Sequence, residues 1–301
     1  MITSEPREQG FDDDPRPVQI GGRANDPAPN LLDDESSSTD LTVVDFGDDA
    51  GRGMEKPRLE EQLTPFLAVL QALSPQCQEI SDKYLPDARP GMFFNSATLE
   101  LNPGREGIEF VPVFRDYLYG EWTNRDQGGG FHGTKQPDDP IVRDLLKAQG
   151  RFRKLLMPDG HELVEQFNLY ALVGRSPLVI DHAARVVMGF TSTKIGPYRQ
   201  WFTRADAIQY RDRSGKLIKP PLWAHRWRLS TFPTSDKQGR PYYNVKLDLL
   251  NPGPPYASLL ARTDPLYLAA REFYDQAAAG IVKVDYAEAA TREPGDDDTP
   301  F

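Results

Sequence analysis

The sequence predicts a mainly β (α+β) fold in which five strands form a small barrel, with one helix between the third and fourth strands. Three observations support this prediction. Five segments between residues 107 and 250 have the apolar alternation or the β-branched and aromatic content of strands. One amphipathic segment separates the third from the fourth. Acidic, polar segments at both ends lack any apolar period, so they are expected to remain disordered.

The five predicted strands are residues 107–122, 161–174, 177–193, 222–232 and 241–250. The second alternates most clearly, because Phe167, Leu169 and Val173 share one parity and polar residues take the other. The third is expected to contain a bulge near residues 181–184. The segment DKQGR between the fourth and fifth strands is typical of a hairpin turn.

Helices are expected at residues 58–73, 197–208 and 264–280. Pro65 would kink the first helix or begin a second one, and Pro197 suits the first turn of the middle helix. Asp264 is the expected N-cap of the last helix and Gly280 its end. Residues 281–286 can add a closing strand.

Five strands with a helix between the third and fourth follow the element order of the OB-fold, a small Greek-key barrel that binds single strands and oligosaccharides. Insertions at 123–160 and 251–263 are longer than a minimal barrel needs. The predicted organisation is therefore a disordered acidic arm at 1–57, an OB-like single-strand-binding domain with helical additions at 58–286, and a disordered acidic tail at 287–301.

The net charge of -10 is unevenly distributed. Residues 1–57 carry 14 acidic and 5 basic side chains, and residues 285–301 carry 6 and 1. Residues 58–284 carry 25 acidic and 29 basic side chains, so this part is mildly basic. The whole-chain charge argues against a nucleic-acid partner, but the charge of the predicted folded part does not.

Motifs for catalysis, metals and membranes are missing from the sequence. The loop GGGFHGTK at 128–135 lacks the Gly-Lys-Ser/Thr order of a phosphate-binding loop, and the four histidines show no metal-ligand spacing. Cys77 is the single cysteine, so no disulfide can form within the chain. We therefore expect no enzyme activity, no cofactor, no metal and no membrane span, and with no secretory leader visible we expect a cytoplasmic protein.

A protein that binds single strands needs cations for phosphates and aromatic faces for bases. Alternation in the fourth and fifth strands places both on one outer face, and OB-folds also use the loops between strands one and two and between strands four and five. The expected DNA-binding residues are Arg115, Tyr117, Trp122, Arg125, Phe131, Lys135, Lys194, Arg226, Arg228, Lys237, Arg240, Tyr242 and Lys246.

The segment DDDTPF at 296–301 resembles the C-terminal tip of bacterial single-stranded-DNA-binding proteins, in which acidic residues precede Pro-Phe. This resemblance covers six residues, and the body looks more like the larger phage-encoded binders. It implies that Phe301 enters a hydrophobic pocket on a partner and that Asp296, Asp297, Asp298 and Pro300 assist. The implied partners are polymerase, helicase-primase or nuclease, beside single-stranded DNA itself.

The sequence thus predicts a non-sequence-specific single-stranded-DNA-binding protein of phage replication, recombination or repair, located in the cytoplasm of the bacterial host. The sequence does not distinguish a strand-annealing protein from one that only coats single strands. It is also compatible with a homo-oligomer. The first alternative is a protein-interaction or virion-associated β-domain protein that does not bind DNA. The second is a metal-dependent nuclease, which the missing motifs disfavour.

Overall fold

The computed structural model describes residues 52–53, 63–123, 130–150, 154–251, 258–284 and 286. The elements below belong to the unit Lys56–Phe301. They are mainly β, with three α-helices and several short 3-10 turns. Nearly all of the predicted acidic arm, and all of the predicted acidic tail, lie outside the described residues.

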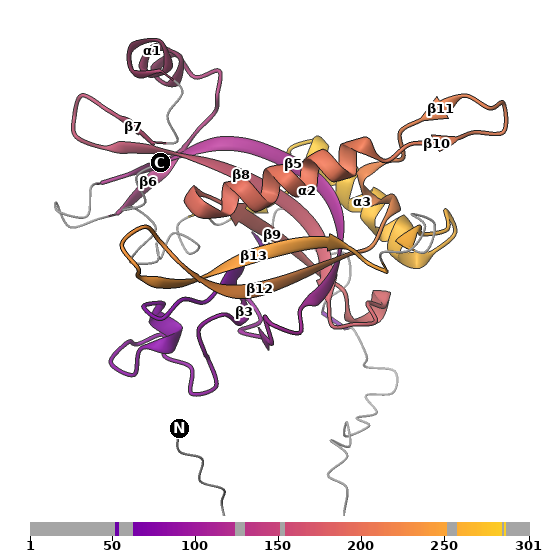
Figure 1. Ribbon diagram of the computed structural model, residues 1–301, viewed down its shortest axis with the longest axis horizontal. Helices are drawn as coiled ribbons and strands as arrows, with labels where there is room; N and C mark the ends of the chain where they lie inside the picture. Colours follow the sequence, from indigo (N-terminus) through magenta and orange to yellow (C-terminus); the bar gives the residue numbers. More distant parts are fainter. Residues whose placement is uncertain are drawn as a thin grey trace, which may run out of the picture. The chain divides into compact units, whose positions relative to one another are not determined.

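The largest sheet contains seven antiparallel strands (Figure 1). They are β5 (Ile108–Trp122), β6 (Phe131–Lys135), β7 (Lys154–Leu156), β8 (Glu162–Gly174), β9 (Ala184–Phe190), β12 (Trp227–Ser235) and β13 (Pro241–Leu249). Their main path is β13-β12-β5-β8-β7, with β6 paired to β5 and β9 paired to β8. The long β5–β8 ladder changes register between Pro112 and Phe114, which reverses the side-chain parity of β5.

The five predicted strands are present as β5, β8, β9, β12 and β13, but the expected closed barrel is not found. In the described ranges, β9 and β13 do not pair with each other. A smaller sheet of β2 (Leu67–Val69), β3 (Phe93–Asn95) and β4 (Leu101–Asn102) contacts both. Phe66 bridges to Val187 of β9, and Gln71 exchanges two hydrogen bonds with the Tyr243 backbone, of 2.9 and 2.8 Å. These contacts engage the two edges that a closed barrel would join.

The helix predicted at 58–73 is wrong in its described part. Residues from Leu63 onward form β1 (Leu63–Thr64) and β2, and β1 pairs in parallel with β14 (Lys283–Val284). Pro65 cannot donate a helical hydrogen bond, and its carbonyl instead accepts from Val187 N at 2.8 Å. The buried, exposed, buried pattern of β2 has the two-residue period of a strand.

In the described part of the chain, three helices pack against strands of the sheet: α1 (Pro140–Gln149), α2 (Ile195–Ala207) and α3 (Pro265–Ala278). Tyr198 and Trp201 of α2 pack into the core formed with β2, β3, β9, β12 and β13. Phe273 of α3 packs into a second core, on the other side of β5 and β8. The helix α1 was not predicted, and Asp139 caps it by accepting a hydrogen bond from Ile141 N at 3.0 Å.

The remaining elements are short. They are the 3-10 turns η3 (Pro75–Cys77), η5 (Ile180–His182), η6 (Ser192–Lys194) and η7 (Leu222–Ala224) and the hairpin β10 (Tyr210–Arg211) with β11 (Leu217–Ile218). The turn η5 takes the place of the expected bulge. The turn η7 breaks the expected alternation of the fourth strand, so Trp223 joins the α3 core whereas Trp227 joins the α2 core. No helix in the described ranges is long and apolar enough to cross a membrane.

Candidate nucleic-acid interface

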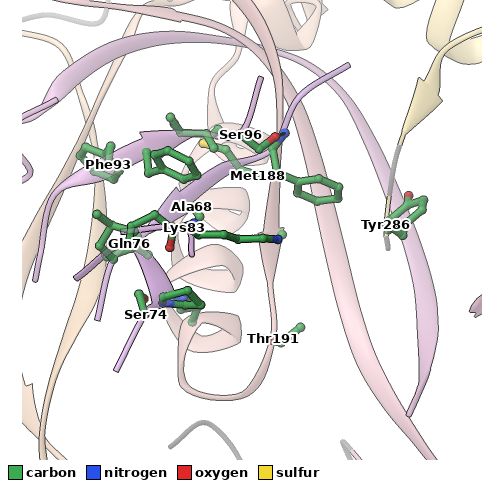
Figure 2. A pocket seen from close by; sticks show the side chains of 18 of the residues that line it. Ala68, Ser74, Gln76, Lys83, Phe93, Ser96, Met188, Thr191 and Tyr286 are labelled. Carbon is green, nitrogen blue, oxygen red and sulfur yellow. Dashed lines mark hydrogen bonds between the residues drawn. The ribbon is translucent and has the colours of Figure 1, made fainter. Parts of the chain in front are cut away.

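A cavity of about 420 Å³ lies where the small sheet meets β9 and the end of the β5–β6 hairpin (Figure 2). Its lining comes mainly from β2, β3, β9 and the 74–85 segment, with single side chains from β8, β12 and β13. Trp122, Phe131, Lys194 and Tyr286 complete it. We call this the aromatic cavity. Its volume falls within the roughly 300–1,000 Å³ typical of small-molecule sites.

One wall of the aromatic cavity consists of four rings. Trp122 at the end of β5 is paired in register with Phe131 at the start of β6, and their ring centroids are 5.2 Å apart. Tyr286 lies 6.5 Å from Phe131 and 5.6 Å from Phe66, centroid to centroid. Trp122, Phe131 and Tyr286 are half-buried, so part of each ring stays accessible. Such rings can stack on a planar ligand.

A buried polar chain holds Tyr286 in this wall. The Asn168 side chain is fully buried and donates from Nδ2 to the Tyr286 hydroxyl at 2.9 Å, while its Oδ1 accepts from Gln166 Nε2 at 2.6 Å. Burial, together with the neighbouring Tyr170 and Asp116, raises the pKa of Tyr286 above its usual range. Burial also raises the pKa of Tyr170, to about 12. Both phenols therefore stay protonated at neutral pH and remain hydrogen-bond donors.

Two lysines contribute positive charge to the lining. Lys194 ends η6 directly before α2, and Lys83 comes from the loop after η3 and extends among the lining side chains (Figure 2). The described lining also contains one carboxylate, Asp82. Rings together with ammonium groups are the combination that single-stranded nucleic acid requires. The sequence predicted Trp122, Phe131 and Lys194 for this role.

Phe66, Lys83 and Tyr286 were missed. Phe66 was assigned to the interior of a helix, because residues 58–73 appeared helical. Lys83 lies in a loop and Tyr286 at the end of the folded part, where neither has a periodic pattern around it. Tyr286 directly precedes the acidic tail, and its position in the expected closing strand was the only available signal.

A second polar surface covers the outer face of the β12–β13 hairpin. Arg228, Phe232, Tyr242 and Lys246 lie there, and Phe232 is 41% exposed. The cations are partly neutralised, since Lys246 Nζ is 2.8 Å from an Asp248 carboxylate oxygen. At the hairpin turn, Lys237 is exposed and Arg240 forms an ion pair with Asp236 at 2.5 Å.

Four other predicted residues have structural contacts away from the aromatic cavity. The Arg226 guanidinium is 3.4 Å from the buried Glu109 carboxylate, so Arg226 does not share the β12–β13 outer face as expected. Lys135 forms an ion pair of 3.1 Å with Glu121. The Arg115 guanidinium lies 3.7 Å above the Phe202 ring, and the Tyr117 ring packs on Phe167. Arg125, Asp296, Asp297, Asp298, Pro300 and Phe301 lie outside the described residues.

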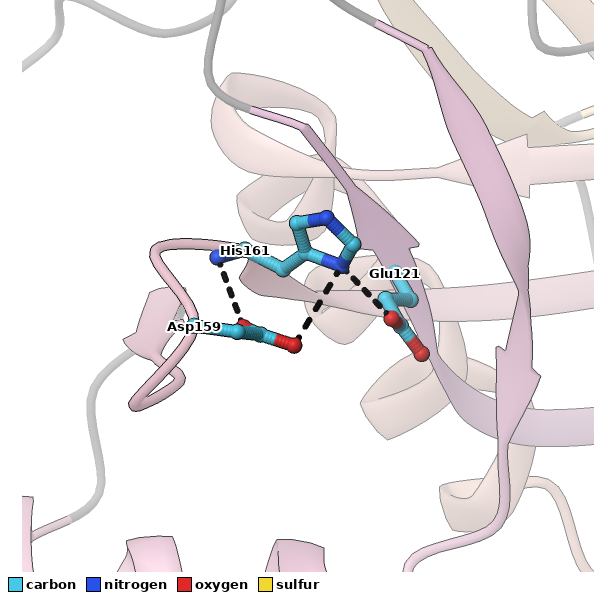
Figure 3. A group of neighbouring side chains, drawn as sticks. All are labelled: Glu121, Asp159 and His161. Atoms are coloured by element: carbon cyan, nitrogen blue, oxygen red, sulfur yellow. Dashed lines mark hydrogen bonds and ion pairs between the residues drawn. The ribbon is translucent and has the colours of Figure 1, made fainter.

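Two histidines that are distant in the sequence meet beside the β5–β6 hairpin. The rings of His132 and His161 stack with centroids 4.2 Å apart, and His161 also contacts Glu121 and Asp159 (Figure 3). The two histidines are brought together by the antiparallel pairing of β5 with both β6 and β8. Their spacing in the sequence therefore gave no indication of this cluster.

The model of one protein family, described as Pam3 phage gp34-like protein, matches residues 34–283 of the chain. The match includes every described residue of the aromatic cavity except Tyr286. No curated protein and no solved structure matches.

Proposed function

This chain belongs to the Pam3 phage gp34-like family, and we propose that it is a non-sequence-specific single-stranded-DNA-binding protein of phage replication, recombination or repair. The observation that carries this proposal is the convergence of Trp122, Phe131 and Lys194 in one cavity. Trp122 and Phe131 face each other across one hairpin, Lys194 comes from a distant part of the sequence, and each was expected to contact DNA. Tyr286 and Lys83 add a further ring and a further cation to the same lining.

The chemistry of the aromatic cavity suits an unstacked base. Every base has a π-face, so half-buried rings bind bases with little sequence preference, at about 1–3 kcal/mol for each base. Lys83 and Lys194 provide ammonium groups for the adjoining phosphates. Each phosphate contact releases condensed counterions, which makes the affinity fall as salt rises. We expect strong salt dependence with weak base selectivity.

The position of the cavity within the sheet also supports the proposal. We interpret the order β13-β12-β5-β8-β9 as an opened OB-like arrangement, with β2–β4 placed at its two edges. OB-folds bind ligands on the face of their second and third strands, beside the loops after the first and the fourth. In this numbering those strands are β8 and β9, and both contribute lining residues, Gln166 and Gly189. Trp122 and Phe131 flank the first of the two loops.

We further propose that the acidic segment 296–301 recruits replication or recombination proteins and does not take part in stacking. Its three aspartates and Phe301 combine charge steering with apolar burial, which suits a docking segment. The protein would act in the cytoplasm of the bacterial host and without a catalytic step of its own.

The proposal is tested by fluorescence anisotropy of a labelled poly-dT oligomer with the full chain, across a salt series in EDTA. Phe131→Ala removes one ring of the cavity and should weaken binding about 5- to 150-fold, the equivalent of about 1–3 kcal/mol. Lys194→Ala should lower the salt slope by about 0.7. Leu217→Ala, at an exposed position on the β10–β11 hairpin, serves as the control and should leave the affinity unchanged.

Two other outcomes would redirect the interpretation. If Phe232→Ala weakens binding and Phe131→Ala does not, the outer face of β12–β13 is the DNA surface and the cavity is not. If the full chain does not bind at low salt, single-strand binding is wrong, and a protein-interaction or virion-associated role takes its place. Cleavage of the oligomer on addition of Mg²⁺ would favour the nuclease alternative instead.

A further inference from the structure

A histidine and two carboxylates converge on one point outside the aromatic cavity (Figure 3). Glu121 lies near the end of β5, whereas Asp159 and His161 come from the turn that precedes β8. His161 Nδ1 is 2.8 Å from Glu121 Oε1 and 3.7 Å from Asp159 Oδ2. We propose that these three residues bind a divalent transition-metal cation of the zinc type, with water completing the coordination.

The spacing of the three ligand atoms fits such a cation. Zinc binds imidazole nitrogen and carboxylate oxygen at about 2.0–2.2 Å, so two ligands separated by 90–120° at the metal are roughly 2.8–3.8 Å apart. The two measured distances from Nδ1, 2.8 and 3.7 Å, lie within this interval. The three ligand atoms all lie within 4.8 Å of one another, so small side-chain rotations would complete the site.

Hydrogen bonding explains only part of this cluster. Nδ1 of His161 has one hydrogen to donate, and Glu121 at 2.8 Å is its natural acceptor. Asp159 Oδ2 faces the same nitrogen at 3.7 Å, which is beyond hydrogen-bond range. Asp159 Oδ1 separately accepts from the His161 backbone N at 3.0 Å, which fixes the direction of the carboxylate. A cation between the three groups would engage all of them at once.

One ammonium group lies beside the two carboxylates of the cluster. The Lys135 Nζ atom is 3.1 Å from Glu121 Oε2 and would repel an incoming cation. The site should consequently bind a metal more tightly when this ammonium is removed.

A bound metal would link the loop end of the β5–β6 hairpin to the turn that precedes β8. Glu121 directly precedes Trp122, and the Asp159–His161 turn leads into β8. The cation would therefore fix the end of the hairpin that carries Trp122 and Phe131. The metal site does not depend on the proposed function, because its residues differ from those that line the cavity. DNA binding is measured in EDTA, which removes free metal, so the two proposals can fail separately.

Isothermal titration of the EDTA-treated and dialysed full chain with Zn²⁺ tests the proposal. One equivalent should bind to the wild type, and His161→Ala should abolish that binding. Asp159→Asn, at an exposed position where the fold is not at risk, should weaken it at least 10-fold, whereas Lys135→Met should strengthen it. His182→Ala, at an exposed histidine on η5, is the matched control and should bind as the wild type does.

Absence of saturable Zn²⁺ binding would overturn the proposal. So would equal affinity of the wild type, His161→Ala and Asp159→Asn, because the metal would then be bound elsewhere. Circular dichroism of each variant establishes that it is folded. If His161→Ala fails to fold, the opposite changes expected from Asp159→Asn and Lys135→Met decide the question.

Discussion

Replacement of Asn168 by leucine tests whether a buried hydrogen-bond chain holds the aromatic wall together. The Asn168 side chain is fully buried, donates to the Tyr286 hydroxyl at 2.9 Å and accepts from Gln166 at 2.6 Å. Leucine has the same number of side-chain heavy atoms and the same branching but cannot form either bond. Gln166 lines the cavity and can bond to water instead, whereas the Tyr286 hydroxyl loses its donor and keeps Tyr170 as its remaining hydrogen-bond partner.

We expect Asn168→Leu to lower the free energy of unfolding by about 1 kcal/mol, since one hydrogen bond contributes about 0.5–1.5 kcal/mol. For a folded part of this size the melting temperature should fall by about 2–4 °C. Urea denaturation followed by circular dichroism measures the change. Because Tyr286 forms part of the cavity wall, the affinity for poly-dT should fall as well.

A double-mutant cycle with Tyr286→Phe isolates the hydrogen bond. Tyr286→Phe removes the hydroxyl and should cost about 1 kcal/mol by itself. If the Asn168–Tyr286 bond is real, the double variant loses less than the sum of the two single losses, by about 0.5–1.5 kcal/mol. Additive losses, or an Asn168→Leu variant as stable as the wild type, would refute the reasoning.

Two further predictions concern the stability of the fold. His225 is buried between Tyr210 and Ser258, and burial lowers its pKa. The contribution of neutral His225 to stability is therefore fully present above the unfolded-state pKa of about 6.5. It is lost as the pH falls toward the folded-state pKa. His225→Gln should flatten this loss in urea denaturation at pH 7.5 and 5.5, and an unchanged slope would contradict the assignment. A methyl group at Gly104 would overlap the Gly91 carbonyl oxygen, so Gly104→Ala should unfold the protein or strongly lower its melting temperature. Gly196→Ala, where the added methyl group meets open space, should change stability by less than about 1 kcal/mol, and equal effects of the two would count against a steric cause.

Local pattern determined much of the fold. The alternation of Phe167, Leu169 and Val173 predicted the central strand β8, because a strand with a buried face requires a two-residue period. Asp264 was predicted as the N-cap of α3 and accepts from Leu266 N at 2.8 Å. Caps and periods can be read locally because the groups that satisfy them lie within a few residues. The same logic failed at 58–73, where helical spacing over one short segment was outweighed by pairing with β9 and β14.

Only the tertiary structure decided which residues meet. Phe66, Phe131 and Tyr286 form one wall because strands distant in the sequence pair at that edge, and no local period encodes such a contact. The partners of the charged side chains are likewise decided by contacts between distant parts of the sequence. Arg226 has the parity of an outer-face residue, yet its guanidinium is engaged by buried Glu109. The sequence by itself determined where β5, β8, β9, β12 and β13 form, where two of the helices begin and where charge concentrates. Long-range pairing decided that an aromatic cavity and a histidine–carboxylate cluster exist, because each is assembled from groups that only the folded chain brings within contact distance.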